Sequence, residues 1–223
     1  MAMIPSSALS HPAATTADLS AMRRSARRAR RAVGGEARAA AGKAAAKLLA
    51  ASGLLIAGAH IACYAPLLEE FPTTALLQLA LRRGCVIYLP VIASRRLRLL
   101  RFAPVLLPRG GSDHTLLAAL TRRNRYGIAE PSAPRHLWRS ARTLDLIMLP
   151  LVAFDASGHR LGMGGGYYDR ALANGGGRRP FKLGIAYECQ HLPLIPRRAW
   201  DVPLDAVLTE KTLRRPMPAR HVD

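Results

Sequence analysis

Acidic residues are scarce in this sequence. Its 223 residues include 14 Asp and Glu against 33 Lys and Arg, which gives a formal net charge of +19. An excess of this size favours polyanionic ligands such as nucleotides, polyglutamate chains or nucleic acids. A simpler interpretation stays open, in which most of the arginines form only a solvated surface.

Other missing features disfavour several classes of protein. No run of 18 apolar residues occurs, so we expect no membrane span. The N-terminus lacks the charged and apolar segments of a signal peptide, and we therefore expect a cytoplasmic protein. The three cysteines are scattered, which favours free thiols over disulfides or a metal site. The seven histidines show no ligand spacing, and no Ser/His/Asp or Cys/His set indicates a protein nucleophile.

Half of the residues are hydrophobic, which is enough for one sizeable core. Residues 1–17 are rich in Ala, Ser, Thr and Pro, and we expect a disordered tail there, followed by a single domain over residues 18–223. Asp18 is a candidate N-cap for a basic helix over 19–33. An alanine-rich helix over 36–52 follows, and Gly53 ends it.

A βαβ unit comes next in the sequence. Residues 59–65 and 86–91 have the composition of strands, and the run between them predicts a helix that Thr73 caps. Such a unit implies parallel strands with a right-handed crossover. The later elements expected are an edge strand over 97–103, a short helix ending at Arg123 and a strand over 182–187. This order indicates an α/β domain with a mainly parallel sheet between helices, in three layers.

The most informative stretch spans residues 149–172, LPLVAFDASGHRLGMGGGYYDRAL. It has the order strand, glycine-rich loop and helix, with the helix beginning at Tyr167. Glycines without Cβ, followed by a helix N-terminus, let a phosphate approach backbone N–H groups. Arg160 adds a cation, and Asp169 could hold a magnesium ion together with phosphate oxygens. The spacing G-x-G-G-G is neither a dinucleotide fingerprint nor a P-loop, so the residues alone leave a tight connection and a phosphate site equally open.

This stretch closely resembles the signature of the 5-formyltetrahydrofolate cyclo-ligase family, also called methenyltetrahydrofolate synthetase. The family pattern is P-x-x-A-F-D-x-x-G-x-R-L-G-x-G-G-G-Y-Y-D-R-x-L, and weaker blocks of similarity extend over residues 20–212. The resemblance implies a fold similar to the NagB/RpiA/CoA-transferase-like proteins. It also implies ATP-dependent cyclisation of 5-formyltetrahydrofolate, with or without a polyglutamate tail, to 5,10-methenyltetrahydrofolate with the use of Mg²⁺. We expect the protein to be a monomer.

The resemblance also implies which residues form the site. The expected nucleotide-binding residues are Arg23, Arg27, Arg160, Gly162, Gly164, Gly165, Gly166, Tyr167, Tyr168 and Asp169. Among these, Arg160, Tyr167 and Asp169 would act in catalysis. The folate would contact Glu70, Tyr126 and Tyr167, and the metal would contact Asp169 and Asp205.

The sequence departs from the family pattern at several basic positions. Many members have Arg in place of Met163, and some have Lys in place of Gly165. The family's N-terminal helix carries a K-x-x-x-R pattern, whose arginine corresponds to Arg23 and whose lysine position falls near Leu19 or Ser20. The other arginines of this helix, Arg24, Arg28 and Arg30, are expected on a solvated face.

The implied reaction transfers a phosphoryl group from ATP to the formyl oxygen, after which N10 of the folate attacks the activated carbon and phosphate leaves. This route needs no protein nucleophile, in agreement with the absence of a nucleophile set. Two alternatives remain. One is a nucleic-acid-binding module built on the arginine-rich helix. The other is a sugar-phosphate isomerase or CoA-transferase-like enzyme of the same fold.

Overall fold

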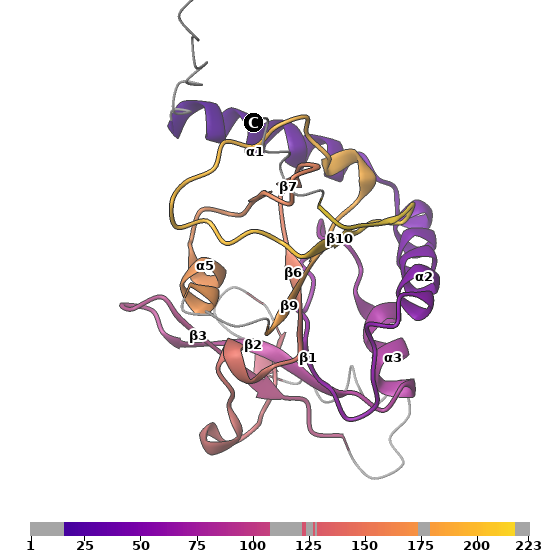
Figure 1. Cartoon of the computed structure of the whole chain (residues 1–223), viewed down its shortest axis with the longest axis vertical. Helices are drawn as coiled ribbons and strands as arrows, with labels where there is room; N and C mark the ends of the chain where they lie inside the picture. The colour runs from indigo at the N-terminus through magenta and orange to yellow at the C-terminus, as the bar shows by residue number, and fades with distance from the viewer. Residues whose placement is uncertain (1–15, 108–121, 124–126, 128, 174–178, 217–223) are drawn as a thin grey trace, which may run out of the picture.

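A computed structural model of the chain describes residues 16–107, 122–123, 127, 129–173 and 179–216. These residues form a seven-stranded sheet with helices around it, in the strand order β11-β10-β9-β6-β1-β2-β3 (Figure 1). The two edge strands, β3 and β11, run antiparallel to their neighbours, and the inner strands pair in parallel. The α/β class with a mainly parallel sheet is therefore confirmed.

The helices and strands occur in the predicted order along the chain. The sheet strands are β1 (His60–Ala62), β2 (Val86–Ser94), β3 (Leu99–Pro104), β6 (Leu146–Pro150), β9 (Phe181–Ile185), β10 (Ala206–Leu208) and β11 (Leu213–Arg214). The helices are α1 (Thr16–Arg31), α2 (Gly35–Ala51), α3 (Thr74–Arg82) and α5 (Tyr167–Leu172). Two small antiparallel pairs join β4 (Arg122–Arg123) to β5 (Ala129–Glu130) and β7 (Ala153–Phe154) to β8 (Arg160–Leu161).

The sheet separates two apolar layers. Adjacent residues of a strand point to opposite faces, and in β6 Met148 packs into the cluster under α2 and α3, whereas Ile147 packs into the cluster under α5. The helices on the two faces give the predicted three layers (Figure 1). Helix α1 contacts β7 and the 3₁₀ turn Glu188–Gln190, which follow the carboxyl ends of β6 and β9. The helix therefore lies over the edge of the sheet where α/β proteins place their ligand sites.

The local predictions differ from the structure in three places. The prediction that Asp18 caps the first helix is wrong, because α1 begins at Thr16 and Asp18 lies within its first turn. Thr73 is the N-cap of α3, but its hydroxyl donates to the Tyr64 carbonyl at 3.0 Å instead of capping the helix. The predicted end of a short helix at Arg123 is wrong, because Arg122 and Arg123 form a strand that pairs with β5. The rest of that helix, over 112–121, lies outside the described residues.

The structure also bears on the expected free thiols and on the expected N-terminal tail. Cys63 and Cys85 are buried free thiols, as expected, and Cys189 is an exposed one. Helix α1 begins at Thr16, two residues inside the expected tail of residues 1–17, and the remainder of that tail is not described. Among the described helices, none combines the length and apolar character that crossing a membrane requires.

Asp155 fixes the β7–β8 turn from which the glycine-rich loop departs. Its side chain is buried, and its carboxylate accepts hydrogen bonds from the backbone N–H groups of Ser157, His159 and Ile195 at 2.9–3.0 Å. The His159 ring lies 3.1 Å from the same carboxylate. A buried carboxylate with this many donors joins the turn firmly to the 192–195 segment.

Asp155→Asn is therefore predicted to lower the free energy of unfolding by about 3 kcal/mol, because an amide presents its own N–H to donors that need an acceptor. Urea unfolding measures the change. Asp201→Asn is the matched control, since the Asp201 carboxylate accepts from one backbone N–H, that of Arg198, and is half-buried. A loss for Asp155→Asn no larger than for the control would show that the turn does not depend on this carboxylate.

Candidate active site

The glycine-rich loop connects β8 to α5 in a backbone conformation that glycine makes possible. Gly164 and Gly166 have φ angles of +94° and +67°, and Gly166 is the N-cap of α5. Side chains with a Cβ avoid this region. The predicted order of strand, glycine-rich loop and helix is confirmed, with Tyr167 as the first residue of the helix.

Two arginines of α1, both expected from the sequence to bind the nucleotide, reach this loop. Arg23 Nε donates to the carbonyl oxygen of Gly162 at 2.9 Å. One helical turn later, Arg27 Nη2 lies 3.2 Å from the sulfur of Met163. These residues are more than 130 positions from the loop in the sequence, so the fold itself brings the cations and the glycines together.

Around Arg23, the nearby positive charges outweigh the effect of the neighbouring acid. Burial lowers the pKa of Arg23, and the charges of Arg198 and Arg27 lower it further, while Asp201 opposes the shift. Arg27 Nε is buried and has no hydrogen-bond partner among the described residues. An anion bound here would relieve the repulsion and accept from an orphaned donor.

Arg160 and Asp169 pair with each other. Arg160 Nη2 donates to Asp169 Oδ1, and Nη1 donates to the carbonyl oxygen of Val202. The side chain of Arg160 is only 6% exposed. Arg160 therefore links the loop helix to the 198–204 segment, and its contact with Asp169 leaves the second carboxylate oxygen, Oδ2, for another partner.

Asp205 lies in a different part of the sheet. It precedes β10, where its Oδ2 accepts from the Lys182 backbone N–H at 2.7 Å and pairs with Lys182 Nζ at 2.8 Å. Asp205 therefore lies at the amino-terminal ends of β9 and β10, whereas the glycine-rich loop follows the carboxyl-terminal ends of β6 and β8. Within the described ranges, no group of three or more His, Cys, Asp or Glu side chains could hold a metal ion.

Glu70 faces the loop helix from the segment that follows β1. Its Oε2 accepts from the Leu67 N–H at 2.9 Å, and burial raises the pKa of Glu70. Burial also raises the pKa of Tyr168, and the neighbouring Cys63 thiol and Glu70 carboxyl raise it further. Glu70 and Tyr168 are therefore electrostatic neighbours. Tyr167 is half-buried at the start of α5, and Tyr126, the predicted folate-stacking residue, lies outside the described residues.

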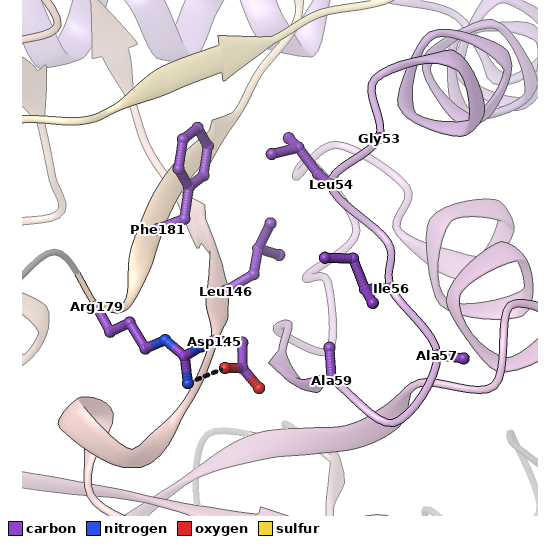
Figure 2. Close-up of a pocket in the computed structure, with 9 residues that line it drawn as sticks. All are labelled: Gly53, Leu54, Ile56, Ala57, Ala59, Asp145, Leu146, Arg179 and Phe181. Atoms are coloured by element: carbon purple, nitrogen blue, oxygen red, sulfur yellow. Dashed lines mark ion pairs between the residues drawn. The ribbon is translucent and has the colours of Figure 1, made fainter.

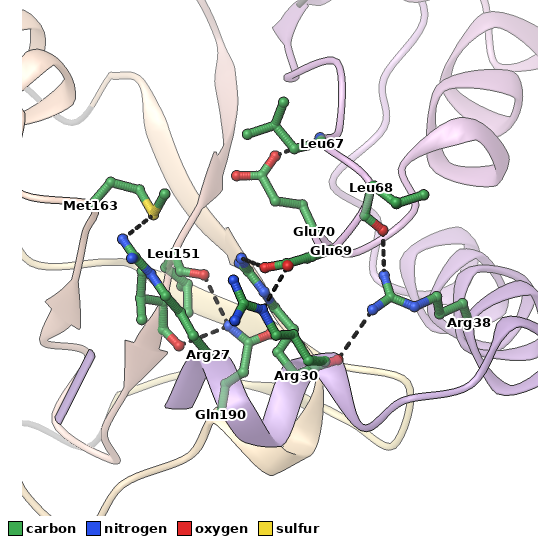
Figure 3. A network of polar contacts seen from close by, with 12 residues as sticks. Arg27, Arg30, Arg38, Leu67, Leu68, Glu69, Glu70, Leu151, Met163 and Gln190 are labelled. Atoms are coloured by element: carbon green, nitrogen blue, oxygen red, sulfur yellow. Dashed lines mark hydrogen bonds and ion pairs between the residues drawn. The ribbon is translucent and has the colours of Figure 1, made fainter. Parts of the chain in front are cut away.

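Helix α1 also contacts the Glu70 segment (Figure 3). Arg31 Nε lies 2.6 Å from Glu69 Oε1, and Arg30 Nη2 lies 3.7 Å from Glu69 Oε2. Arg38 of α2 donates to the Leu68 carbonyl at 2.6 Å. The expectation that Arg30 is solvated is wrong, since this residue is 4% exposed, because the segment after β1 covers it. Arg24 and Arg28 are exposed, as expected.

A separate pocket of about 350 Å³ opens near the amino-terminal ends of the inner strands, away from the glycine-rich loop (Figure 2). Leu54, Ile56, Leu146 and Phe181 line much of it, and its ion pair joins Asp145 to Arg179 at 2.7 Å. Its position at the beginning of β6 and β9 and its apolar lining do not suit a phosphate chain.

Sequence analysis did not identify two arginines that lie near the loop. Arg198 acts on Arg23 through its charge, and Arg98 Nη1 donates to the Gly165 carbonyl at 3.2 Å. The only sequence signal for either was its basic character, which 33 residues share. Their proximity to the loop depends on tertiary structure.

Comparison with known proteins agrees with this geometry. The sequence model of the 5-formyltetrahydrofolate cyclo-ligase family matches residues 15–210. The 5-formyltetrahydrofolate cyclo-ligase of Haemophilus influenzae is 36% identical over 152 residues, which are 67% of this chain and 74% of that protein. The corresponding protein of Mycolicibacterium smegmatis is 33% identical over 166 residues, 72% of this chain and 78% of its own length.

A solved structure supports the same assignment. The 5,10-methenyltetrahydrofolate synthetase of Aquifex aeolicus is 28% identical and superposes with a TM-score of 0.71, over 92% of this chain and 96% of that one. The family model, which matches residues 15–210, includes the arginine-rich helix, the βαβ unit and the glycine-rich loop. The chain belongs to the 5-formyltetrahydrofolate cyclo-ligase family.

Proposed function

We propose that this protein cyclises 5-formyltetrahydrofolate to 5,10-methenyltetrahydrofolate, with conversion of ATP to ADP and phosphate. The observation that carries the proposal is the meeting of Arg23 and Arg27 with the glycine-rich loop, next to the half-buried Glu70. One side of this site suits a phosphate chain, and the other offers a carboxylate to a neutral ring system.

The chemistry is a problem of activation. An amide oxygen is a poor leaving group, and phosphorylation of the formyl oxygen makes departure as phosphate possible. N10 of the same folate then attacks the formyl carbon and closes the ring. Catalysis of this kind depends mainly on positioning the substrates and on neutralising charge at the transferred phosphoryl group.

The arginines and glycines of the site would bind the nucleotide. Arg27 has a buried Nε–H donor without a partner among the described residues, and Arg23 lies next to Gly162 and Gly164. The loop glycines leave the backbone open to phosphate oxygens. Arg160 would act mainly by fixing the start of α5, because both terminal nitrogens already contact protein oxygens and the side chain is only 6% exposed.

Glu70 would face the folate. Pterin rings present N–H donors, and a carboxylate accepts them through charge-assisted hydrogen bonds. Tyr167 and Tyr126 are the proposed ring contacts.

Magnesium would arrive with the nucleotide. The described part of the chain offers no all-protein metal cage, and Mg²⁺ commonly uses phosphate oxygens with one or two carboxylates. Oδ2 of Asp169 suits such a shared ion. Asp205 is the weaker candidate, since Lys182 already pairs with its carboxylate.

The family match favours this function over the two alternatives. A nucleic-acid-binding module would not require the glycine loop, and a sugar-phosphate isomerase or CoA transferase would not require ATP. Purified protein incubated with ATP, Mg²⁺ and 5-formyltetrahydrofolate should form the conjugated methenyl product, which near-ultraviolet absorbance detects. Product in the absence of ATP, or no product with it, would contradict the proposal.

Glu70→Gln is predicted to lower kcat/KM for the folate about ten- to a hundredfold, because it removes one charge-assisted hydrogen bond. ATP affinity, measured without folate by calorimetry, should stay the same. Glu69→Gln is the matched control, because the neighbouring acid pairs with Arg31 instead. If Glu70→Gln weakens ATP binding and spares the folate KM, the two substrates have been placed the wrong way round.

The raised pKa of Glu70 predicts a pH effect. The pKa of the carboxyl lies above its ordinary value of 4.5, because burial disfavours the charged form. As the pH is lowered through this raised pKa, the carboxylate is protonated, and kcat/KM for the folate should decrease. The same shift stabilises the folded state at pH values below 4.5. This contribution to stability is lost as the pH rises through the pKa that Glu70 has in the folded protein. Glu70→Gln should therefore remove the acidic limb without loss of stability at neutral pH. An unchanged pH profile in the variant would assign the limb to another group.

Asp169→Asn is predicted to raise the half-saturating Mg²⁺ concentration about tenfold, about 1.4 kcal/mol of lost metal binding. It should also lower stability by about 1–3 kcal/mol, because Arg160 loses its anionic partner. Asp205→Asn should lower stability without changing the Mg²⁺ dependence. Steady-state rates across a magnesium titration, with thermal melts, separate the two effects. An unchanged titration for Asp169→Asn would leave this residue a purely structural role.

A further inference from the structure

The turn between β2 and β3 carries an arginine to the glycine-rich loop. Ser94 pairs with Leu99, so residues 95–98 form the turn, and the Arg98 N–H donates to the Arg95 carbonyl at 3.1 Å. Strand β3 packs beside α5 (Figure 1). This packing places Arg98 Nη1 at 3.2 Å from the carbonyl oxygen of Gly165.

The backbone of Arg98 is unfavourable for its residue type. Its φ angle is +47°, and no other non-glycine residue in the described part of the chain has a positive φ. Glycine adopts this conformation at no steric cost, whereas a side chain with a Cβ does not. Glycine would therefore suit the turn better, and the arginine side chain has to be explained by something outside the turn.

The guanidinium of Arg98 is suitably placed for a phosphate chain. It is exposed, and its described contact with Gly165 uses one of its five N–H donors. Arg23 contacts the loop at Gly162, so arginines from two separate elements flank the position of Gly164. Guanidinium forks match phosphate oxygens in pairs. We propose that Arg98 binds the triphosphate of the nucleotide at the glycine-rich loop, an inference that rests on the proposed function.

Arg98→Gly tests this without strain, because glycine fits the φ of +47°. Calorimetric titration of the full-length protein with Mg²⁺ and either ATP or AMP is the measurement. We expect ATP affinity to fall about tenfold, the loss of a charge-assisted contact, and AMP affinity to stay unchanged. The melting temperature should equal or exceed that of the wild type, and the folate KM should not change. Arg96→Ala removes one charge from the same exposed turn and should leave ATP affinity within about twofold.

Unchanged ATP affinity in Arg98→Gly would overturn the inference, and so would an equal loss of ATP and AMP affinity. An equal effect of Arg96→Ala would also overturn it, since general charge would then explain the loss. Wild-type protein that neither binds ATP nor forms the methenyl product would contradict the proposed function itself. If the wild-type protein is active and the Arg98→Gly variant binds ATP as tightly as the wild type does, only the role of Arg98 would be contradicted.

Discussion

The repulsion among Arg23, Arg27 and Arg198 at one glycine-rich loop is the interaction that the site depends on. Burial and its neighbours depress the pKa of Arg23, and Arg27 keeps a buried donor without a partner in the described structure. Such an arrangement is costly in the absence of an anion and favourable in its presence. The apolar contacts of α1, through Leu19 and Ala26, hold the arginines there despite the repulsion.

The same helix joins the two halves of the site. Its first arginines contact the loop that would bind the nucleotide, and its last ones contact Glu69, next to the carboxylate that would bind the folate. A shift of α1 would therefore disturb both loops together. Arg38 adds a third connection, because it donates to the carbonyls of Val33, Leu68 and Arg30 and so fixes the end of α1 against the same segment.

Much of this was predictable because the signals were local. Glycine spacing and a following helix located the loop, the resemblance to the family identified Arg23 and Arg27, and alternation of strand and helix indicated the parallel sheet. The contribution of Arg98 was not predictable, because its reach depends on the register of the β2–β3 hairpin. The burial of Arg30 and the pairing of Arg160 with Asp169 were also missed, since both depend on partners far away in the sequence.

The central claim is that this site moves a phosphoryl group onto the formyl oxygen of the folate. The most direct test uses 5-formyltetrahydrofolate labelled with ¹⁸O in the formyl group, turned over with ATP, Mg²⁺ and the wild-type protein. Mass spectrometry of the released phosphate reads the outcome. We expect one ¹⁸O atom in each phosphate formed, because the formyl oxygen departs attached to phosphorus. Unlabelled phosphate formed together with the methenyl product would contradict this account.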